Sequence, residues 1–290
     1  MPKPLISVCV PVHNGGLFIK ENLNSLYSQT YPNLEILISD DFSNDNSVPI
    51  IRNIKNKDTQ IYLQPKRLGW VGNCNFLIGK SSGVYFSILP QDDLIPHNYY
   101  EKLYTGFEKN NLAINCYPYI KSIGHVEGLI QQPSITGTLE NRIYEVISNH
   151  FWAVSFRGLV KNNLPEQLRY LSTDQHQDMM ADTLWILQHA IAGELHAIDL
   201  PYYKRYHHSG EHSSWSQKPL QDKITAWSEH CATLYAYAIP FVSDQKKLYT
   251  ACLNRLIQNK QYLVEIKNDE FDHQLLNTFN EKINHVKEKD

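Results

Sequence analysis

The chain has 290 residues, of which 42% are hydrophobic, enough for one large α/β domain or a domain with a helical appendage. Its 27 basic and 30 acidic residues give a net charge of −3, which offers no general attraction to nucleic acid or to anionic membranes. The five cysteines are single and show no CxxC spacing, which argues against disulfides and sulfur-bound metal and favours reduced thiols. We expect neither a signal peptide nor a transmembrane span, because no apolar run approaches ~20 residues.

The first hundred residues alternate between apolar runs typical of strands and amphipathic stretches typical of helices. Strands are predicted at residues 6–10, 34–38, 61–63 and 84–89, and helices at 18–27 and 71–78. Such alternation requires right-handed crossovers and predicts a mostly parallel sheet with helices on both faces. This first half ends near Lys109.

The pattern is looser beyond residue 110. We expect strands at 112–119 and 195–198, helices at 139–148 and 181–192, and a mainly helical remainder after Pro219. The sequence therefore predicts an α/β domain over residues 1–218 and a C-terminal helical extension over 219–290.

Two acidic turns follow predicted strands. Asp40 and Asp41 come after the second strand, and Asp92 and Asp93 come after the strand at 84–89. Because the carboxyl ends of parallel strands share one edge of a sheet, both pairs should face one crevice. Adjacent carboxylates repel each other, so this arrangement favours a cation or a donor-rich ligand between them. We therefore expect a nucleotide and a divalent metal at this edge.

Four motifs in this order resemble family 2 glycosyltransferases of the GT-A fold. They are Pro11-Val12-His13-Asn14, residues 26–36, residues 40–45, and Gln91-Asp92-Asp93. The resemblance covers residues 5–110 strongly and 175–208 more weakly, and the helical tail lies outside it. It implies a Rossmann-like GT-A sheet with a nucleotide-sugar half at 1–110 and an acceptor half at 111–218. It also implies inverting transfer from a nucleotide diphosphate sugar, with UDP as the expected nucleotide and dTDP or GDP as alternatives.

The resemblance assigns a set of donor-binding residues. They are Pro11, Val12, His13, Asn14, Asp40, Asp41, Arg67, Asn73, Gln91 and Asp92. His13 stands where the family often has tyrosine and offers a ring face to a base, while the two aspartates would accept hydrogen bonds from a base or ribose. Each assignment has an alternative. His13 could face water, and Arg67 could belong to a solvated basic turn. The two aspartates could cap a helix, although Ser43 and Asp45 suit that role better.

The resemblance also assigns metal ligands. Asp93, Asp92 and His207 are expected to hold Mn²⁺ or Mg²⁺ against the diphosphate, because hard cations prefer carboxylate oxygen. Pro90 stands where the family has its first aspartate, which removes one ligand. Asp93 as the cap of a turn and His207 as a surface side chain are the alternatives.

A base must take the proton from the acceptor hydroxyl, and the family uses a carboxylate for this step. By resemblance the base is Asp182, at the start of the predicted helix 181–192, with Asp178 as the second candidate. Both residues could instead be helix-start residues favoured by the helix dipole.

The expected partners are a nucleotide-sugar donor and a saccharide or glycolipid acceptor in bacterial surface polysaccharide or lipopolysaccharide synthesis. The expected location is the cytoplasm, with peripheral attachment at the inner face of the membrane as an alternative. A catalytically silent nucleotide-sugar binding module is the main alternative function, motivated by Pro90 and the two candidates for the base. Nucleotidyl transfer is disfavoured, because residues 11–14 stand where a glycine-rich basic loop would be required.

Overall fold

The computed structural model describes residues 2–56, 58–124, 127–173, 178, 180–206 and 217–287. The chain forms two compact units, one of residues 1–136 and 153–207 and the other of residues 137–152 and 208–290. Helix α5 (Leu139–Asn149) therefore belongs with the C-terminal helices. The domain division predicted from the sequence, with a boundary at residue 218, placed this helix in the first domain.

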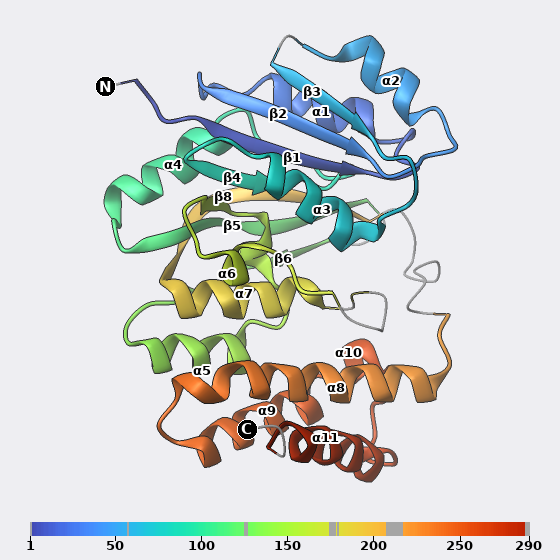
Figure 1. The fold of residues 1–290 in the computed structure, drawn as a ribbon, viewed down its shortest axis with the longest axis vertical. Helices are drawn as coiled ribbons and strands as arrows, with labels where there is room; N and C mark the ends of the chain where they lie inside the picture. The colour runs from blue at the N-terminus through green and yellow to red at the C-terminus, as the bar shows by residue number, and fades with distance from the viewer. Residues whose placement is uncertain are drawn as a thin grey trace. The chain divides into compact units, whose positions relative to one another are not determined.

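One mixed sheet, of eight strands in the described part of the chain, organises the first unit (Figure 1). Its parallel part consists, in spatial order, of β3 (Thr59–Leu63), β2 (Leu34–Asp40), β1 (Ile6–Val12) and β4 (Tyr85–Ile88). Next to β4 lie β7 (Leu159–Lys161) and then β5 (Ala113–Gly124), which pairs antiparallel with β7 and β6 (Gly128–Ile130) and parallel with β8 (Glu194–Tyr206). The predicted strands are all present, and β5 and β8 continue well beyond their predicted ends.

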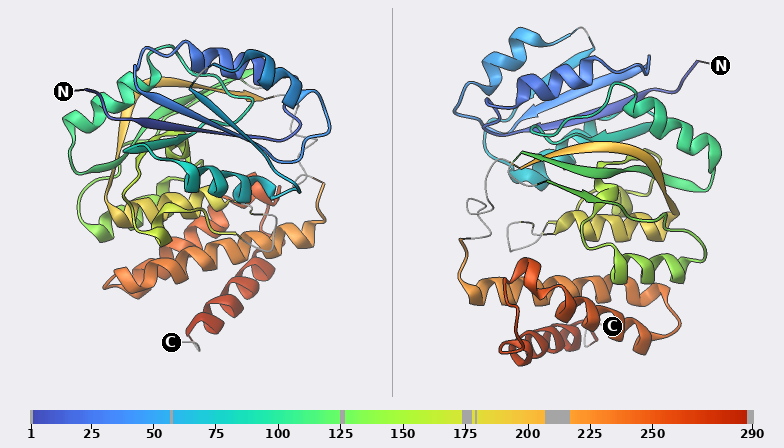
Figure 2. Two further views of the ribbon diagram at one scale, coloured as in Figure 1. Left: turned by 45° about the horizontal axis from the view of Figure 1, so that its top comes forward. Right: turned by 180° about the vertical axis from the view of Figure 1, so that it is seen from behind.

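Helices cover both faces of this sheet (Figures 1 and 2). One face carries α1 (Ile19–Tyr27), α2 (Ser47–Ile54) and α4 (Tyr99–Lys109). The other carries α3 (Gly69–Lys80), α6 (Glu166–Arg169) and α7 (Ala181–Ala192). The 3₁₀ turn η1 (Val154–Arg157) contacts α7. Coverage on both faces explains why β1 is an almost unbroken apolar run, since nearly all of its side chains are buried.

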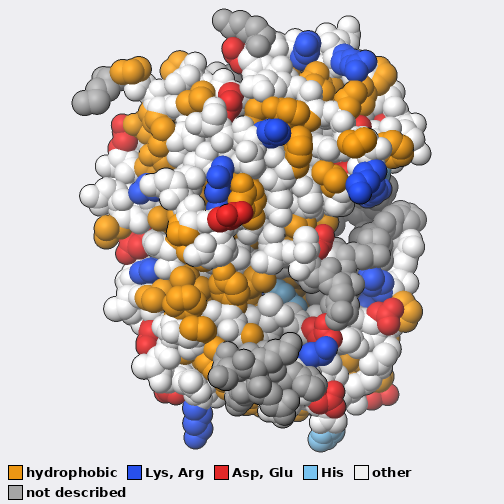
Figure 3. All heavy atoms as spheres, viewed as in Figure 1, with side chains coloured by type: hydrophobic (Ala, Val, Ile, Leu, Met, Phe, Trp, Pro, Cys, Tyr) orange, Lys and Arg blue, Asp and Glu red, His pale blue; other side chains and the backbone are white. Residues whose placement is uncertain are grey.

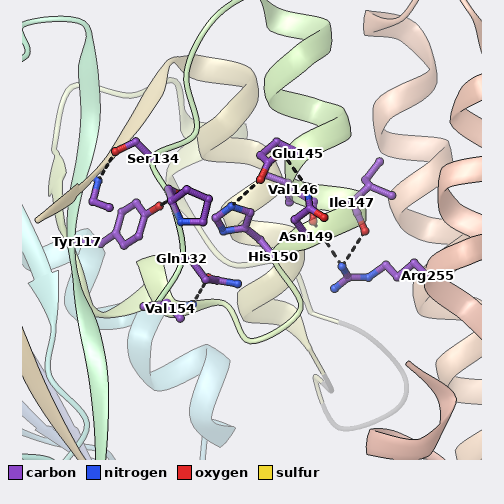
Figure 4. Close-up of polar contacts among 12 residues, drawn as sticks. Tyr117, Gln132, Ser134, Glu145, Val146, Ile147, Asn149, His150, Val154 and Arg255 are labelled. Atoms are coloured by element: carbon purple, nitrogen blue, oxygen red, sulfur yellow. Dashed lines mark hydrogen bonds and ion pairs between the residues drawn. The ribbon is translucent and has the colours of Figure 1, made fainter. Parts of the chain in front are cut away.

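The second unit is helical. It contains α5, α8 (Leu220–Ala238), η2 (Ile239–Phe241), α9 (Gln245–Gln258), α10 (Lys260–Leu263) and α11 (Asp272–Lys287). Arg255 of α9 is 2% exposed, and its Nη1 donates to the carbonyl oxygen of Ile147 in the last turn of α5 at 3.0 Å (Figure 4). A cation at this position satisfies carbonyls that the helix itself leaves unpaired. This contact explains why α5 groups with α9.

The distribution of surface charge and the state of the cysteines are those that the composition predicts. Basic and acidic side chains are interspersed on the face drawn in Figure 3. All five cysteines belong to the described chain, and they are buried and unpaired. Every helix within the described ranges is too short or too polar to cross a bilayer.

Gly158 provides a test of this packing. A Cβ at Gly158 would lie 2.1 Å from Oδ1 of Asn115 and 2.7 Å from the carbonyl oxygen of Cys116, whereas at Gly128 the nearest atom would be 4.0 Å away. We expect Gly158→Ala to lower the free energy of unfolding by about 2 kcal/mol or more, because backbone atoms cannot move aside cheaply. Urea denaturation measures this, with Gly128→Ala as the control. Equal effects of the two substitutions would contradict the packing.

Candidate functional site

A pocket opens where β1, β2 and β4 end, at one edge of the sheet because the three strands are parallel. Its volume is about 220 Å³. Its walls are the loops after these strands and the first turns of α3, and its lining residues are Pro11, Val12, His13, Asp41, Arg67, Trp70, Asn73, Cys74, Ile88, Pro90, Gln91 and Asp92. Most of the donor-binding residues predicted from the sequence therefore lie around one cavity.

His13 is fixed on both sides of its ring. Its Nδ1 lies 2.8 Å from the carbonyl oxygen of Asp41, which can only accept, so Nδ1 carries the hydrogen. Nε2 is then the acceptor, and it receives a hydrogen bond from Nη1 of Arg67. This pairing links the loop after β1 to the segment before α3.

Gln91 connects the loop after β4 to the loop after β1. Its Oε1 accepts from the backbone N–H of His13 at 2.9 Å, and its Nε2 donates to the carbonyl oxygen of His13 at 3.0 Å. Gly15 leaves room for this pair, because a Cβ there would lie 2.4 Å from the Oε1 atom of Gln91. The side-chain amide thus forms a pair of hydrogen bonds with the His13 backbone, as a peptide group of a neighbouring strand would.

The two aspartates after β2 have different surroundings. Asp41 lines the pocket, and its carboxylate accepts from the backbone N–H groups of Leu68 and Gly69 at 2.5 and 3.0 Å, so it caps the start of α3. Asp40 lies outside the lining and is buried, with Oδ2 accepting from the backbone N–H of Ser43 at 3.0 Å. Oδ1 of Asp40 has no partner among the described residues.

Asn14 and Asn73 complete the predicted donor set. Asn14 lies beside the pocket at a φ of 48°, and its Oδ1 accepts from the backbone N–H of Asn44 at 3.0 Å. Asn73 is buried in the pocket wall, where its Nδ2 donates to the carbonyl oxygen of Ser39 at 2.9 Å. Within the described chain its Oδ1 has no partner, so it is available to a donor on a ligand.

The acidic pair after β4 divides between two environments. Asp92 lines the pocket. Asp93 is 2% exposed and turns toward β8, where its carboxylate accepts from the hydroxyl of Tyr202 at 2.8 Å and from the backbone N–H of Arg205 at 2.9 Å. Burial raises the pKa of the Asp93 carboxyl to about 6, the Arg157 guanidinium opposes this shift, and Asp92 adds to it. Both hydrogen bonds go to β8, so the carboxylate joins the acidic loop to that strand and does not cap the turn that follows Asp93.

Two contributors were not among the donor-binding residues predicted from the sequence. Asn22 of α1 is fully buried, and its Nδ2 donates to the carbonyl oxygens of Pro90 and Asp93 at 2.8 and 2.7 Å, which holds the acidic loop in place. Trp70 lines the pocket, is 41% exposed and packs edge-on against Phe156. The signal available in the sequence for Trp70 was its place directly after Gly69, in the turn that opens a predicted helix. Nothing in the local sequence distinguishes Asn22.

The predicted base candidates lie at the start of α7. Asp182 is in its first turn, and its Oδ1 accepts from the backbone N–H of Thr183 at 2.9 Å. Asp178 precedes the helix at a φ of 60°. His207 lies outside the described residues, as do His208, His212 and Trp215.

The donor set fits a hard divalent cation only in part. Asp92 presents a carboxylate at the pocket, whereas both carboxylate oxygens of Asp93 already accept hydrogen bonds. Among the described residues, no three His, Cys, Asp or Glu side chains form a cluster that could hold a metal. Asp92 is therefore the residue that suits such an ion, with phosphate oxygens and water as the remaining ligands.

Curated glycosyltransferases resemble this chain in sequence. The chain is 32% identical over 139 residues to an uncharacterized glycosyltransferase of Haemophilus influenzae, an alignment that covers 47% of this chain and 43% of that relative. The chain thus spans less than half the length of the first curated relatives that it matches.

Solved structures share the whole fold. S. aureus TarS 1–349 in complex with UDP-GlcNAc superposes with a TM-score of 0.72 at 19% identity, over 97% of this chain and 81% of that one. A mannosyltransferase from Pyrobaculum calidifontis, in complex with GDP-Man and Mn²⁺, gives a TM-score of 0.51 at 15% identity over 99% of this chain and 87% of that one. These likenesses confirm the predicted GT-A fold class.

The family model of glycosyl transferase family 2 matches residues 7–185, which is more than half of the chain and includes the whole pocket. The chain therefore belongs to glycosyl transferase family 2.

Proposed function

We propose that this chain transfers one sugar from a UDP-sugar to an acceptor hydroxyl, with inversion at the anomeric carbon. The observation that carries the proposal is the pocket at the carboxyl ends of β1, β2 and β4, which brings His13, Asp41 and Asp92 around one cavity. The TarS structure solved with UDP-GlcNAc supports UDP as the nucleotide. Family membership supports sugar transfer as the reaction class.

In this proposal the pocket binds the nucleotide. The rings of His13 and Trp70 offer faces to the base, and Oδ1 of Asn73 accepts from one of its N–H groups. Asp41 keeps lone pairs for a ribose hydroxyl or a base N–H while it caps α3. Arg67, held against His13, lies where it can meet a phosphate oxygen.

Asp92 would hold Mn²⁺ or Mg²⁺ at the pocket, and the bound cation would neutralise the negative charge on the departing diphosphate. Asp93 acts indirectly, because its hydrogen bonds with Tyr202 and Arg205 hold the acidic loop against β8. Asp182 takes the proton from the acceptor hydroxyl, with Asp178 as the second candidate. The acceptor is a saccharide or glycolipid of a bacterial surface polysaccharide pathway, reached from the cytoplasm or from the inner face of the membrane.

A catalytically silent nucleotide-sugar binding module is the competing function. It is favoured by Pro90, which cannot ligate metal, and by the engagement of both Asp93 oxygens. The two functions differ in turnover, because the silent module binds the donor without releasing its nucleotide.

Donor hydrolysis by the purified chain tests the proposal directly. We expect nucleotide release from UDP-sugars in preference to dTDP- and GDP-sugars, with Mn²⁺ or Mg²⁺ present and not with EDTA. Liquid chromatography of the released nucleotide is the measurement. Binding of UDP-sugars by calorimetry without release, in the presence of a broad set of saccharide acceptors, would support the silent module instead.

The division of the acidic pair predicts different effects of two isosteric substitutions. Asp92→Asn should abolish the metal-dependent reaction and Mn²⁺ uptake in the presence of UDP, because the pocket loses the carboxylate of Asp92. Asp93→Asn should retain Mn²⁺ uptake and mainly change the melting temperature. Electron paramagnetic resonance of free Mn²⁺ reports binding independently of activity. Loss of Mn²⁺ binding in Asp93→Asn, with Asp92→Asn unaffected, would reverse the assignment.

Asp182→Asn should lower the rate of transfer about 100-fold or more, because an amide cannot accept the hydroxyl proton. UDP binding should be unchanged, since Asp182 lies outside the nucleotide pocket. Asp178→Asn is the matched control. A large loss in Asp178→Asn with near-normal Asp182→Asn would move the role to Asp178, and full activity in both variants would remove the base from this segment.

A further inference from the structure

The outer half of β5 carries a hollow that the nucleotide pocket does not include. It consists of two adjoining cavities of about 440 and 760 Å³. The two cavities share Tyr119 and Gln131, so they adjoin each other, and together we call them the β5 groove. Each volume is within the range of small-molecule sites, roughly 300–1,000 Å³.

A bulge in β8 forms one wall of the β5 groove. Tyr117 of β5 pairs with Ala197, whereas Tyr119 pairs with Pro201, so β8 contains two more residues than β5 over this stretch. The extra length places Ile198 and Asp199 along the groove. Bulges of this kind bend a strand and redirect its side chains, and they are frequent beside binding sites.

The opposite wall is residues 131–133, which are held in place by hydrogen bonds (Figure 4). The hydroxyl of Tyr117 donates to the carbonyl oxygen of Pro133 at 2.5 Å, and Oε1 of Gln132 accepts from the backbone N–H of Val154 at 3.3 Å. The next residue, Ser134, accepts from the backbone N–H of Ala197 at 2.9 Å. Both walls are thus fixed before any ligand binds, which lowers the cost of ordering the site.

The lining of the 440 Å³ cavity selects for a neutral, hydroxyl-rich ligand. It offers the amides of Gln131 and Gln132, the carboxylate of Asp199 and the ring of Tyr119, but no lysine or arginine among the described residues. Within the described chain, the side chains of Gln131 and Asp199 make no hydrogen bond to another residue. Amides and carboxylates match sugar hydroxyls, and a tyrosine ring matches the apolar face of a pyranose. In the 440 Å³ cavity a phosphate or sugar acid would meet Asp199 without a cation in the lining, because Lys121 lines the adjoining 760 Å³ cavity together with Glu127.

Tyr119 of the β5 groove lies on the face of the sheet that α7 covers, whereas the side chain of Ile198 lies on the α4 face, since its Cδ1 would be 2.6 Å from a Cβ at Gly106. Asn115, which shares a face with Tyr117 and Tyr119 by the two-residue period of a strand, donates to Ser155 of η1 at 3.0 Å and lies 3.5 Å from Nδ1 of His189 in α7. Helix α7 begins on the side toward which the arrow of β5 points (Figure 1). The twelve residues of α7 span about 18 Å. Tyr119 lies about 20 Å along β5 from Ala113, so the first turn of α7 reaches the level of Tyr119.

The groove also approaches the acidic loop. Leu94, directly after Asp93, pairs with Tyr203 of β8, and Tyr203 pairs in turn with Lys121 in the groove. Two strand spacings, about 10 Å, therefore separate Leu94 from Lys121. A ligand in the groove would lie near both the acidic loop and the start of α7.

We infer that the β5 groove binds neutral pyranose rings of the acceptor saccharide. Tyr119 stacks on one ring, while Gln131 and Asp199 bond its hydroxyls. This inference rests on the proposed sugar transfer for the identity of the ligand as an acceptor. The binding of saccharide itself is independent of turnover.

Saturation-transfer NMR on the full chain tests the groove, with methyl glycosides of glucose, galactose, mannose and N-acetylglucosamine as probes and glucose 6-phosphate as the anionic comparison. We expect at least one neutral glycoside to bind and glucose 6-phosphate not to bind. Tyr119→Ala and Asp199→Ala should each weaken that binding about threefold or more, and Tyr119→Phe should retain it. Leu112→Ala, a substitution at an exposed residue outside the groove, is the control.

A charge reversal separates recognition from folding. Asp199→Lys should allow glucose 6-phosphate to bind, because the lining of the 440 Å³ cavity then includes a cation in place of a carboxylate. Calorimetry with UDP checks in every variant that the nucleotide pocket is intact. Failure of all four glycosides, or binding that is unchanged in Tyr119→Ala and Asp199→Ala, overturns the inference even if donor hydrolysis is observed. Saccharide binding that follows these residues in a chain without turnover would support the groove and refute the transferase.

Discussion

The shape of the pocket depends on the pairing of the Gln91 side-chain amide with the backbone of His13. The two hydrogen bonds, at 2.9 and 3.0 Å, join the loops after β1 and β4. They lie beyond Cys9 and Ile88, the last residues that pair in the β1–β4 ladder. A carboxylate at this position could accept but not donate, and an aliphatic side chain could do neither, so one or both peptide groups of His13 would lose a partner. By holding His13, this pairing also positions Arg67, which donates to the His13 ring. The His13 ring in turn bonds the carbonyl oxygen of Asp41 in the loop after β2.

The acidic loop shows how one dipeptide serves two purposes. Asp92 and Asp93 are adjacent, yet one lines the pocket and the other is buried against Tyr202 and Arg205. Burial and the charge of Asp92 both raise the pKa of Asp93, whereas Arg157 and the two hydrogen bonds favour its ionised form. The loop is thus held from both sides, by Asn22 on its backbone and by β8 on Asp93.

The sequence was sufficient for the strands of the nucleotide half and for most of the pocket, because residues that follow parallel strands must meet at one edge of the sheet. The sequence was not sufficient where a side chain bonds a residue that is far away along the chain. Asp41 caps α3, 27 residues away, and Asp93 bonds Tyr202, 109 residues away, and neither contact leaves a local pattern. The membership of α5 in the second unit depends in the same way on Arg255, which is far from it in sequence.

Strand β8 gives the proposed donor and acceptor sites a common support. Its end, Tyr202 to Arg205, holds Asp93 behind the nucleotide pocket, while its bulge at Ile198 and Asp199 walls the β5 groove. The strand follows α7 after Gly193, so the start of α7, with Asp182, is fixed relative to both sites by one continuous segment of backbone. A change in the β8 bulge would therefore alter where an acceptor lies relative to Asp182 without altering the nucleotide pocket. Acceptor selectivity can in this way vary independently of donor selectivity on one fold.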